Sequence, residues 1–155
     1  MSPPGPVAER FSQRGYDVVQ TVVVPPERFH EPNIHFAFPD PREFDAVVPM
    51  GAPWGAWDDT TIGNWLRPEM NWLRLADDEQ VPVLGICFGG QLLARVHGGS
   101  VERAPSPEIG WSSVWTERPD IVSSGPWFQF HYDRWTVPPE AEEIARNSRA
   151  SQAFM

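Results

Sequence analysis

The sequence has 155 residues, of which 41% are hydrophobic and 21% charged, a balance typical of a chain that folds into one compact domain. Its net charge of -9 disfavours binding to nucleic acid or to a membrane surface, because both partners require clustered Lys and Arg. No apolar run approaches the roughly 20 residues of a membrane span, and the first residues lack the pattern of a signal peptide, so we expect a cytoplasmic protein.

The first part of the chain alternates an expected helix with expected strands. A proline before it and a glycine after it bracket a short helix over residues 7–14. The β-branched run from Asp17 to Val24 predicts a strand that is covered on both faces. The proline-rich residues 25–42 predict an irregular connection. Phe44 to Met50 then predicts a second strand, which ends at a glycine-containing loop.

The middle of the chain repeats this alternation. Apolar residues recur at helical spacing from Pro68 to Glu79, which predicts a crossover helix beginning at that proline. Val81 to Ile86 predicts a third strand, and Phe88 to Val96 a helix that two glycines terminate. The order strand, helix, strand favours a right-handed crossover and a parallel sheet. We therefore predict an α/β fold of three layers, with a mostly parallel central sheet between helices.

The last third has a different pattern. Three short segments, residues 100–102, 112–116 and 128–130, predict strands of a meander. A short helix is predicted from Pro138 to Ala145, and one more strand from Ser151 to Met155. Because no internal repeat and no long linker interrupts the sequence, we interpret residues 1–155 as a single domain.

The only cysteine, Cys87, lies between an expected strand and an expected helix, and a glycine lies two residues away on either side. This spacing is typical of a nucleophile elbow, in which a sharp turn strains the central residue and its neighbours must be tiny. The helix N-terminus would favour the thiolate, and the N–H of Phe88 would face a developing oxyanion. The alternative is that Cys87 is a small buried hydrophobic residue.

Three motifs carry a resemblance to a known family. The segment Gly85-Ile-Cys-Phe-Gly-Gly-Gln resembles the Gly-x-Cys-x-Gly-x-Gln signature of class I glutamine amidotransferases. Upstream, Asp45-Ala-Val-Val-Pro-Met-Gly-Ala-Pro is similar to that family's strand and Gly-Gly-Pro loop. Downstream, His131-Tyr-Asp-Arg-Trp resembles the His-x-Asp segment of the branch close to GMP synthase. The resemblance covers nearly the whole chain and implies a flavodoxin-like arrangement of the three layers.

The resemblance implies that a thioester on the cysteine hydrolyses glutamine to glutamate and ammonia. The implied site consists of the nucleophile Cys87, the oxyanion donors Ala52 and Phe88, and the glutamine-binding residues Gly51, Gln91 and Asp133. The family usually has a second glycine at the position of Ala52, and a backbone donor tolerates this methyl if the loop needs no positive φ. No cofactor and no metal is implied, and the ammonia acceptor would belong to a synthetase partner or an acceptor domain.

The family's catalytic base lies in a His-Pro-Glu motif, which this sequence lacks. We do not assign His131 as the base, because its neighbours match the earlier His-x-Asp segment. We therefore expect a chain that lacks the family's first strand and its C-terminal His-Pro-Glu segment, so that its turnover is impaired. The sheet edges exposed in this way would favour a homo-oligomer or a poorly stable fold.

The sequence leaves two functional hypotheses open. The chain is either an enzyme of glutamine-dependent nitrogen transfer or a non-catalytic binding or assembly protein that keeps the fold and the thiol. An α/β-hydrolase relative is a weaker interpretation, because no histidine follows at a suitable strand end.

Among the other residues, His30 and His35 are expected to be exposed rather than metal ligands, and His97 to lie at a helix end. The tryptophans expected to form packing or lid contacts are Trp54, Trp57, Trp65 and Trp72.

Overall fold

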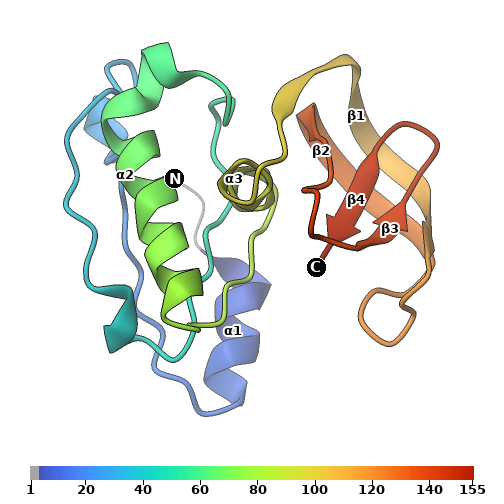
Figure 1. Ribbon diagram of the computed structural model, residues 1–155, viewed down its shortest axis with the longest axis horizontal. Coiled ribbons are helices and arrows are strands. Elements are labelled where there is room, and N and C mark those ends of the chain that lie inside the picture. The colour runs from blue at the N-terminus through green and yellow to red at the C-terminus, as the bar shows by residue number, and fades with distance from the viewer. Residues whose placement is uncertain (1–3) are drawn as a thin grey trace.

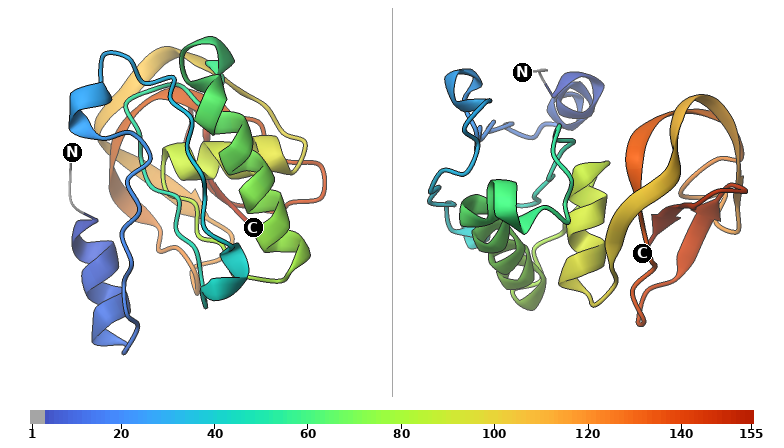
Figure 2. Two further views of the ribbon diagram at one scale, coloured as in Figure 1. Left: turned by 90° about the vertical axis from the view of Figure 1, so that its left-hand side faces the viewer. Right: turned by 90° about the horizontal axis from the view of Figure 1, so that it is seen from above.

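The computed structural model describes residues 4–155, in which helix α3 lies between helix α2 and an antiparallel sheet (Figures 1 and 2). The helices are α1 (Gly5–Gln13), α2 (Asp59–Asp78) and α3 (Phe88–Val96), with two 3-10 turns, η1 (Pro26–Arg28) and η2 (Pro41–Glu43). The strands are β1 (Val101–Thr116), β2 (Gly125–Trp135), β3 (Glu143–Arg146) and β4 (Ser151–Phe154). The predicted helices at the start of the chain and after Cys87 are confirmed, the latter at both ends.

Helix α2 begins nine residues before the predicted start at Pro68, which lies inside the helix. The side chain of Asp58 caps the helix by accepting a hydrogen bond of 3.0 Å from the N–H of Thr61. Ile62 and Leu66 continue the buried stripe toward the N-terminus, so tertiary burial outweighs the hydrogen bond lost at the proline.

Two tryptophans of α2 fix the proline-rich connection against the helix. The indole N–H of Trp65 donates to the carbonyl oxygen of Pro32 at 2.9 Å, and that of Trp72 donates to Pro39 at 2.6 Å. Trp54 packs edge-on against Trp65, with ring centroids 5.8 Å apart. The predicted packing role is confirmed for Trp54, Trp65 and Trp72, whose rings pack in or against the core. Trp57 is 43% exposed and does not pack there, so its packing or lid contact stays a prediction.

The predicted strand from Asp17 to Val24 is wrong. These residues form no strand, and several of their valine side chains are exposed, including Val19 at 68%. A β-branched run becomes a strand only where a neighbouring strand pairs its backbone groups. Residues 17–24 form no ladder with another segment of residues 4–155.

Parallel pairing is present over a very short length. Val47 and Val83 form an isolated parallel bridge, in which the N–H of Val47 donates to Pro82 at 2.9 Å and that of Leu84 to Val47 at 3.0 Å. The second and third predicted strands therefore lie side by side in the predicted direction, but neither is a regular strand. The prediction of a mostly parallel central sheet is not confirmed by the hydrogen bonding of residues 4–155.

The regular sheet has four strands in the order β2-β1-β3-β4, and all its neighbours are antiparallel. The first two predicted meander segments belong to the one long strand β1, whose register against β2 shifts between Arg103 and Glu108. The helix predicted from Pro138 to Ala145 is wrong, because no helix forms there and its last three residues belong to strand β3. Ile144 and Ala145 are buried there, and β3 pairs with both β1 and β4, which outweighs the local helical signal. The predicted last strand is confirmed as β4.

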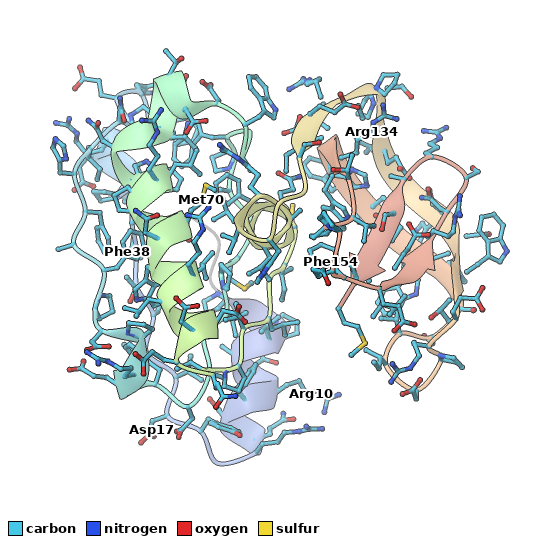
Figure 3. All side chains as sticks on the ribbon, in the orientation of Figure 1. Arg10, Asp17, Phe38, Met70, Arg134 and Phe154 are labelled. Atoms are coloured by element: carbon cyan, nitrogen blue, oxygen red, sulfur yellow. The ribbon has the colours of Figure 1, made fainter. Side chains whose placement is uncertain are left out.

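The main hydrophobic core lies where the buried stripe of α2 packs against α3. Its largest fully buried side chains include Ile62, Leu66, Leu73 and Leu92. In the view of Figure 3, Met70 of α2 and Phe154 of β4 lie on opposite sides of α3. Helix α3 is therefore held from both sides, and its N-terminus has a fixed position. Within residues 4–155, no helix is both long and apolar enough to cross a membrane.

Candidate functional site at the turn before helix α3

Cys87 occupies a strained turn immediately before α3. Its backbone has φ 56° and ψ -111°, a region that residues other than glycine rarely adopt. The segment leading to it is held by the N–H of Ile86, which donates to Pro49 at 3.0 Å. The cysteine is exposed to solvent, so the alternative interpretation of Cys87 as a buried hydrophobic residue is wrong.

Both glycines around Cys87 are required by close backbone contacts. A Cβ added to Gly89 would lie 2.0 Å from the carbonyl oxygen of Pro49, and one added to Gly85 would lie 2.7 Å from the carbonyl of Gly89. Real Cβ atoms do not approach backbone so closely, so the turn excludes any side chain at either position. The elbow geometry predicted from the glycine spacing is therefore present.

The loop after Met50 lies against the thiol. A Cβ added to Gly51 would lie 3.8 Å from the Sγ of Cys87, which places this glycine beside the sulfur. Ala52 follows it, half-buried and packed against the core. Among the non-glycine residues that the structure describes, Gln80 and Cys87 have positive φ and Ala52 does not. The alanine therefore fits the loop without backbone strain.

The surroundings of Cys87 favour the neutral thiol. Desolvation by the surrounding protein raises the pKa of Cys87, and the nearby Asp133 carboxylate raises it further, while the backbone N–H of Phe88 lowers it. The effect expected from the helix N-terminus is therefore opposed by desolvation from the neighbouring groups and by the Asp133 carboxylate. The N–H of Phe88 is nevertheless directed at the sulfur.

Asp133 lies near Cys87 although 46 positions separate them, because β2 runs beside α3. Its side chain is buried, with 8% exposure, and its Oδ1 has no hydrogen-bond partner among the described residues. Gln91 is buried in the first turn of α3, where its N–H donates to the carbonyl of Cys87 at 3.0 Å. This unpaired oxygen of Asp133, close to an exposed thiol, could accept a hydrogen bond from a positively charged group of a ligand.

Sequence reasoning missed a buried polar network behind Asp133. Glu108 of β1 is only 3% exposed and accepts a hydrogen bond of 2.5 Å from the side-chain amide of Asn147. The Nε2 of His131 lies 3.8 Å from the Glu108 carboxylate, and its Nδ1 lies 3.0 Å from the carbonyl oxygen of Asp133. No hydrogen bond joins His131 to Cys87 within residues 4–155. No local sequence pattern signals this network, because its members come from two strands and a turn.

The remaining histidines lie away from the thiol. His97 caps the C-terminal end of α3, as predicted. His30 and His35 are exposed, also as predicted.

Comparison with known proteins agrees with this geometry. The family model described as glutamine amidotransferase class-I matches residues 55–152, which include the elbow and most of the sheet. The chain belongs to the class I glutamine amidotransferase family.

Two curated relatives share this similarity. A glutamine-hydrolyzing GMP synthase subunit from Ignicoccus hospitalis is 30% identical over 115 residues, which cover 70% of this chain and 57% of that protein. Gamma-glutamyl peptidase 2 of Arabidopsis thaliana is 32% identical over 97 residues, which cover 56% of this chain and 39% of that protein. The chain thus spans little more than half the length of the first relative and less of the second.

A solved structure supports the fold. A glutamine amidotransferase from Thermotoga maritima superimposes with a TM-score of 0.74 at 23% identity, covering 96% of this chain and 64% of that one. At this identity the likeness concerns the fold alone. It shows that the chain shares the fold of this glutamine amidotransferase over most of its length.

Proposed function

We propose that Cys87 is the nucleophile of a glutaminase reaction. Its sulfur attacks the side-chain carbonyl carbon of glutamine, the carbon–nitrogen bond breaks, and ammonia leaves with the proton from the thiol. Water then attacks the thioester, which releases glutamate and returns the thiol. The observation that supports this most strongly is the strained turn at Cys87, which costs folding free energy and exposes the only cysteine beside Gly51.

We assign the remaining site residues on the same basis. The N–H groups of Ala52 and Phe88 stabilise the oxyanion of the tetrahedral intermediate, and Phe88 already directs its N–H at the sulfur. Gly51 leaves room for the substrate beside the thiol. Gln91 and Asp133 hold glutamine, and the free carboxylate oxygen of Asp133 matches the α-ammonium group of an amino acid.

We also propose that turnover by this chain alone is weak. The pKa of Cys87 is raised, and no imidazole within residues 4–155 donates to or accepts from the thiol. Proton removal from the thiol and proton delivery to ammonia therefore lack a base here.

The single domain proposed for residues 1–155 would deliver ammonia to a synthetase partner or an acceptor domain. The relative from Ignicoccus hospitalis is named as one subunit of its enzyme, which supports a separate partner chain. The proposed fold also includes a parallel layer, which the short parallel pairing of Val47 with Val83 supports.

A second candidate activity has the same chemistry on a different substrate. The relative from Arabidopsis thaliana is named a gamma-glutamyl peptidase, and cleavage of a γ-glutamyl amide would use the same thioester and the same oxyanion donors. A non-catalytic binding or assembly role is the remaining alternative. It would keep the fold but would not need a reactive thiol.

The test is the intact mass of the protein after incubation with a glutamine-analogue diazo-ketone. We expect a single adduct, which is lost in Cys87→Ala and slowed by free glutamine but not by glutamate. Because the chain has one cysteine, any thiol adduct reports this site. An Asp133→Asn variant should label more slowly with the diazo-ketone although it reacts at least as fast as wild type with iodoacetamide, since it impairs glutamine recognition and removes a carboxylate that raises the pKa of Cys87.

The outcomes separate the three candidates. Protection by glutamine supports the glutaminase site, whereas protection by a γ-glutamyl dipeptide alone favours the peptidase. Equal labelling with and without either compound, in protein that is folded by circular dichroism, would contradict both and favour the non-catalytic role.

A further inference from the structure

One face of the β1–β2 hairpin presents large apolar side chains to solvent. Successive residues of a strand point to opposite sides, and here Glu108, Val114 and Gln129 point inward and are buried. The opposite positions carry six large residues that are 42% to 73% exposed. We call this set the hairpin face: Ile109, Trp111, Trp115, Phe128, Phe130 and Tyr132.

The members of the hairpin face form a continuous surface. Ile109 pairs directly with Phe130 across the strands, and Trp111 pairs with Phe128, whose ring centroid lies 5.7 Å from that of the tryptophan. Tyr132 extends the row, with its ring 6.2 Å from that of Phe130. Both strands lie on the side of the molecule away from α2 (Figure 1). The exposed residues are therefore one patch and not scattered single side chains.

The hairpin face has a cleft on one side and a ridge on the other. The cleft, of about 400 Å³, is lined by Trp111 and Trp115 of β1 and by Arg149 from the turn between β3 and β4. Polar residues of the same segments also line it, among them Glu108, Ser112, Ser113 and Asn147. The ridge consists of Phe128 and Phe130 on β2, at the opposite edge of the sheet. Strand β1 lies between them, since the strand order is β2-β1-β3-β4.

This arrangement is self-complementary. A two-fold axis passing over β1 would bring the phenylalanine ridge of one copy onto the tryptophan-lined cleft of the other, and the reverse contact would form at the same time. A face with a ridge and a cleft on either side of its centre suits an isologous contact.

The size of the hairpin face fits a dimer of moderate stability. An aromatic side chain presents roughly 150 to 250 Å², so six residues at these exposures offer roughly 600 Å² per copy. Two copies would bury roughly 1,200 Å², which is the lower end of the range for specific protein–protein interfaces.

Charge also favours apolar contact at this surface. The chain carries a net charge of -9, yet none of the six residues is charged. The charged groups beside them include Arg103, which lies over the ring of Tyr132 at 5.1 Å, and Arg149 and the buried Glu108 at the cleft. The acidic remainder of two copies would repel, and salt screens this repulsion within about 8 to 10 Å. Self-association through the hairpin face should therefore strengthen as salt is added.

We propose that the hairpin face is the contact surface of a homodimer of this chain. The proposal is independent of the glutaminase assignment, because the six residues are separate from those assigned around Cys87.

Sedimentation velocity over about 1 to 100 µM protein tests this proposal, since that range brackets an interface of moderate affinity. We expect a concentration-dependent dimer whose dissociation constant falls when salt is raised. Phe130→Ser should weaken the dimer at least tenfold, and Trp111→Ser is a second variant on the partner strand. The matched control is Phe29→Ser, because Phe29 is a comparably exposed phenylalanine, at 48%, outside the sheet.

A dimer that Phe130→Ser and Trp111→Ser weaken, and that Phe29→Ser leaves unchanged, supports the proposal. Wild-type protein that stays monomeric over the whole range overturns it. A dimer that neither sheet variant weakens, in protein with wild-type circular dichroism, overturns it equally, because the contact would then lie elsewhere. If one sheet variant does not fold, the other still decides between these outcomes.

Discussion

Glu69 makes the stability of the fold depend on pH. It lies on the buried stripe of α2 between Leu66 and Leu73, with 8% exposure. Within residues 4–155 its side chain forms no ion pair, and burial raises the pKa of Glu69 from 4.5 to about 7. The carboxyl is therefore protonated in the folded protein at pH values where it is ionised in the unfolded chain.

The sign of the effect follows from this difference. Below about pH 4.5 the carboxyl is protonated in both states, so its full contribution to the stability is present. As the pH rises toward 7, the unfolded chain loses the proton and the folded state keeps it, so the free energy of unfolding falls. Each pH unit of difference is worth about 1.4 kcal/mol, which gives a loss of roughly 3 kcal/mol between these pH values.

The perturbation that isolates this effect is Glu69→Gln, which keeps the shape of the side chain but cannot ionise. The free energy of unfolding in urea should be measured for wild type and variant from pH 4 to 8. The variant should gain roughly 3 kcal/mol relative to wild type across this range. Glu79→Gln, the same change at an exposed position at the end of α2, should shift by less than about 0.5 kcal/mol.

The reasoning is refuted if the difference between wild type and Glu69→Gln stays constant from pH 4 to 8. A constant difference would mean that the carboxyl has the same pKa in the folded and unfolded states. A difference of the opposite slope would mean that Glu69 has an ionic partner.

Three further predictions concern the elbow and the core. Gly89→Ala should lower the free energy of unfolding by roughly 3 kcal/mol, because the added methyl would collide with a backbone carbonyl. The control is Gly63→Ala, whose added methyl would have no neighbour nearer than 3.9 Å and should stabilise helix α2 by about 0.5 to 1 kcal/mol. Urea unfolding measures both, and equal effects would contradict the close contact. Trp65→Phe should cost roughly 1 kcal/mol, since the Pro32 carbonyl loses one of its two donors and keeps the N–H of Ile34 at 2.8 Å; no loss in thermal stability would show that the bond contributes little. Iodoacetamide should alkylate Cys87 with a pH midpoint above that of the urea-unfolded chain, and a lower midpoint would show an activating group.

The elbow was predictable because all its information is local. Two glycines flanking a cysteine between an apolar run and a helical run define the strained turn, whatever packs around it. The same reasoning predicted both ends of helix α3. The family resemblance rested on these local motifs as well, and the family match confirms it.

Pairing partners were not predictable in the same way. The run from Asp17 to Val24 has strand-forming side chains, but no neighbouring segment of residues 4–155 forms a ladder with it. Most of residues 143–146 lie within a predicted helix, yet they form β3 because β1 and β4 offer backbone groups on both sides. Helix α2 extended beyond its predicted start because burial of Ile62 and Leu66 compensates for the internal proline.

The sequence by itself determined the position of the thiol, the helix that follows it and the family. The tertiary structure alone decided the direction in which the pKa of that thiol is shifted, because desolvation and the approach of Asp133 depend on how β2 packs beside α3. It also decided which side chains of β1 and β2 are exposed together, since the register between two strands brings residues from distant positions onto one face. The spacing of neighbouring residues is enough to specify a backbone turn. The pKa of a side chain and the make-up of an exposed surface depend instead on which distant segments pack together.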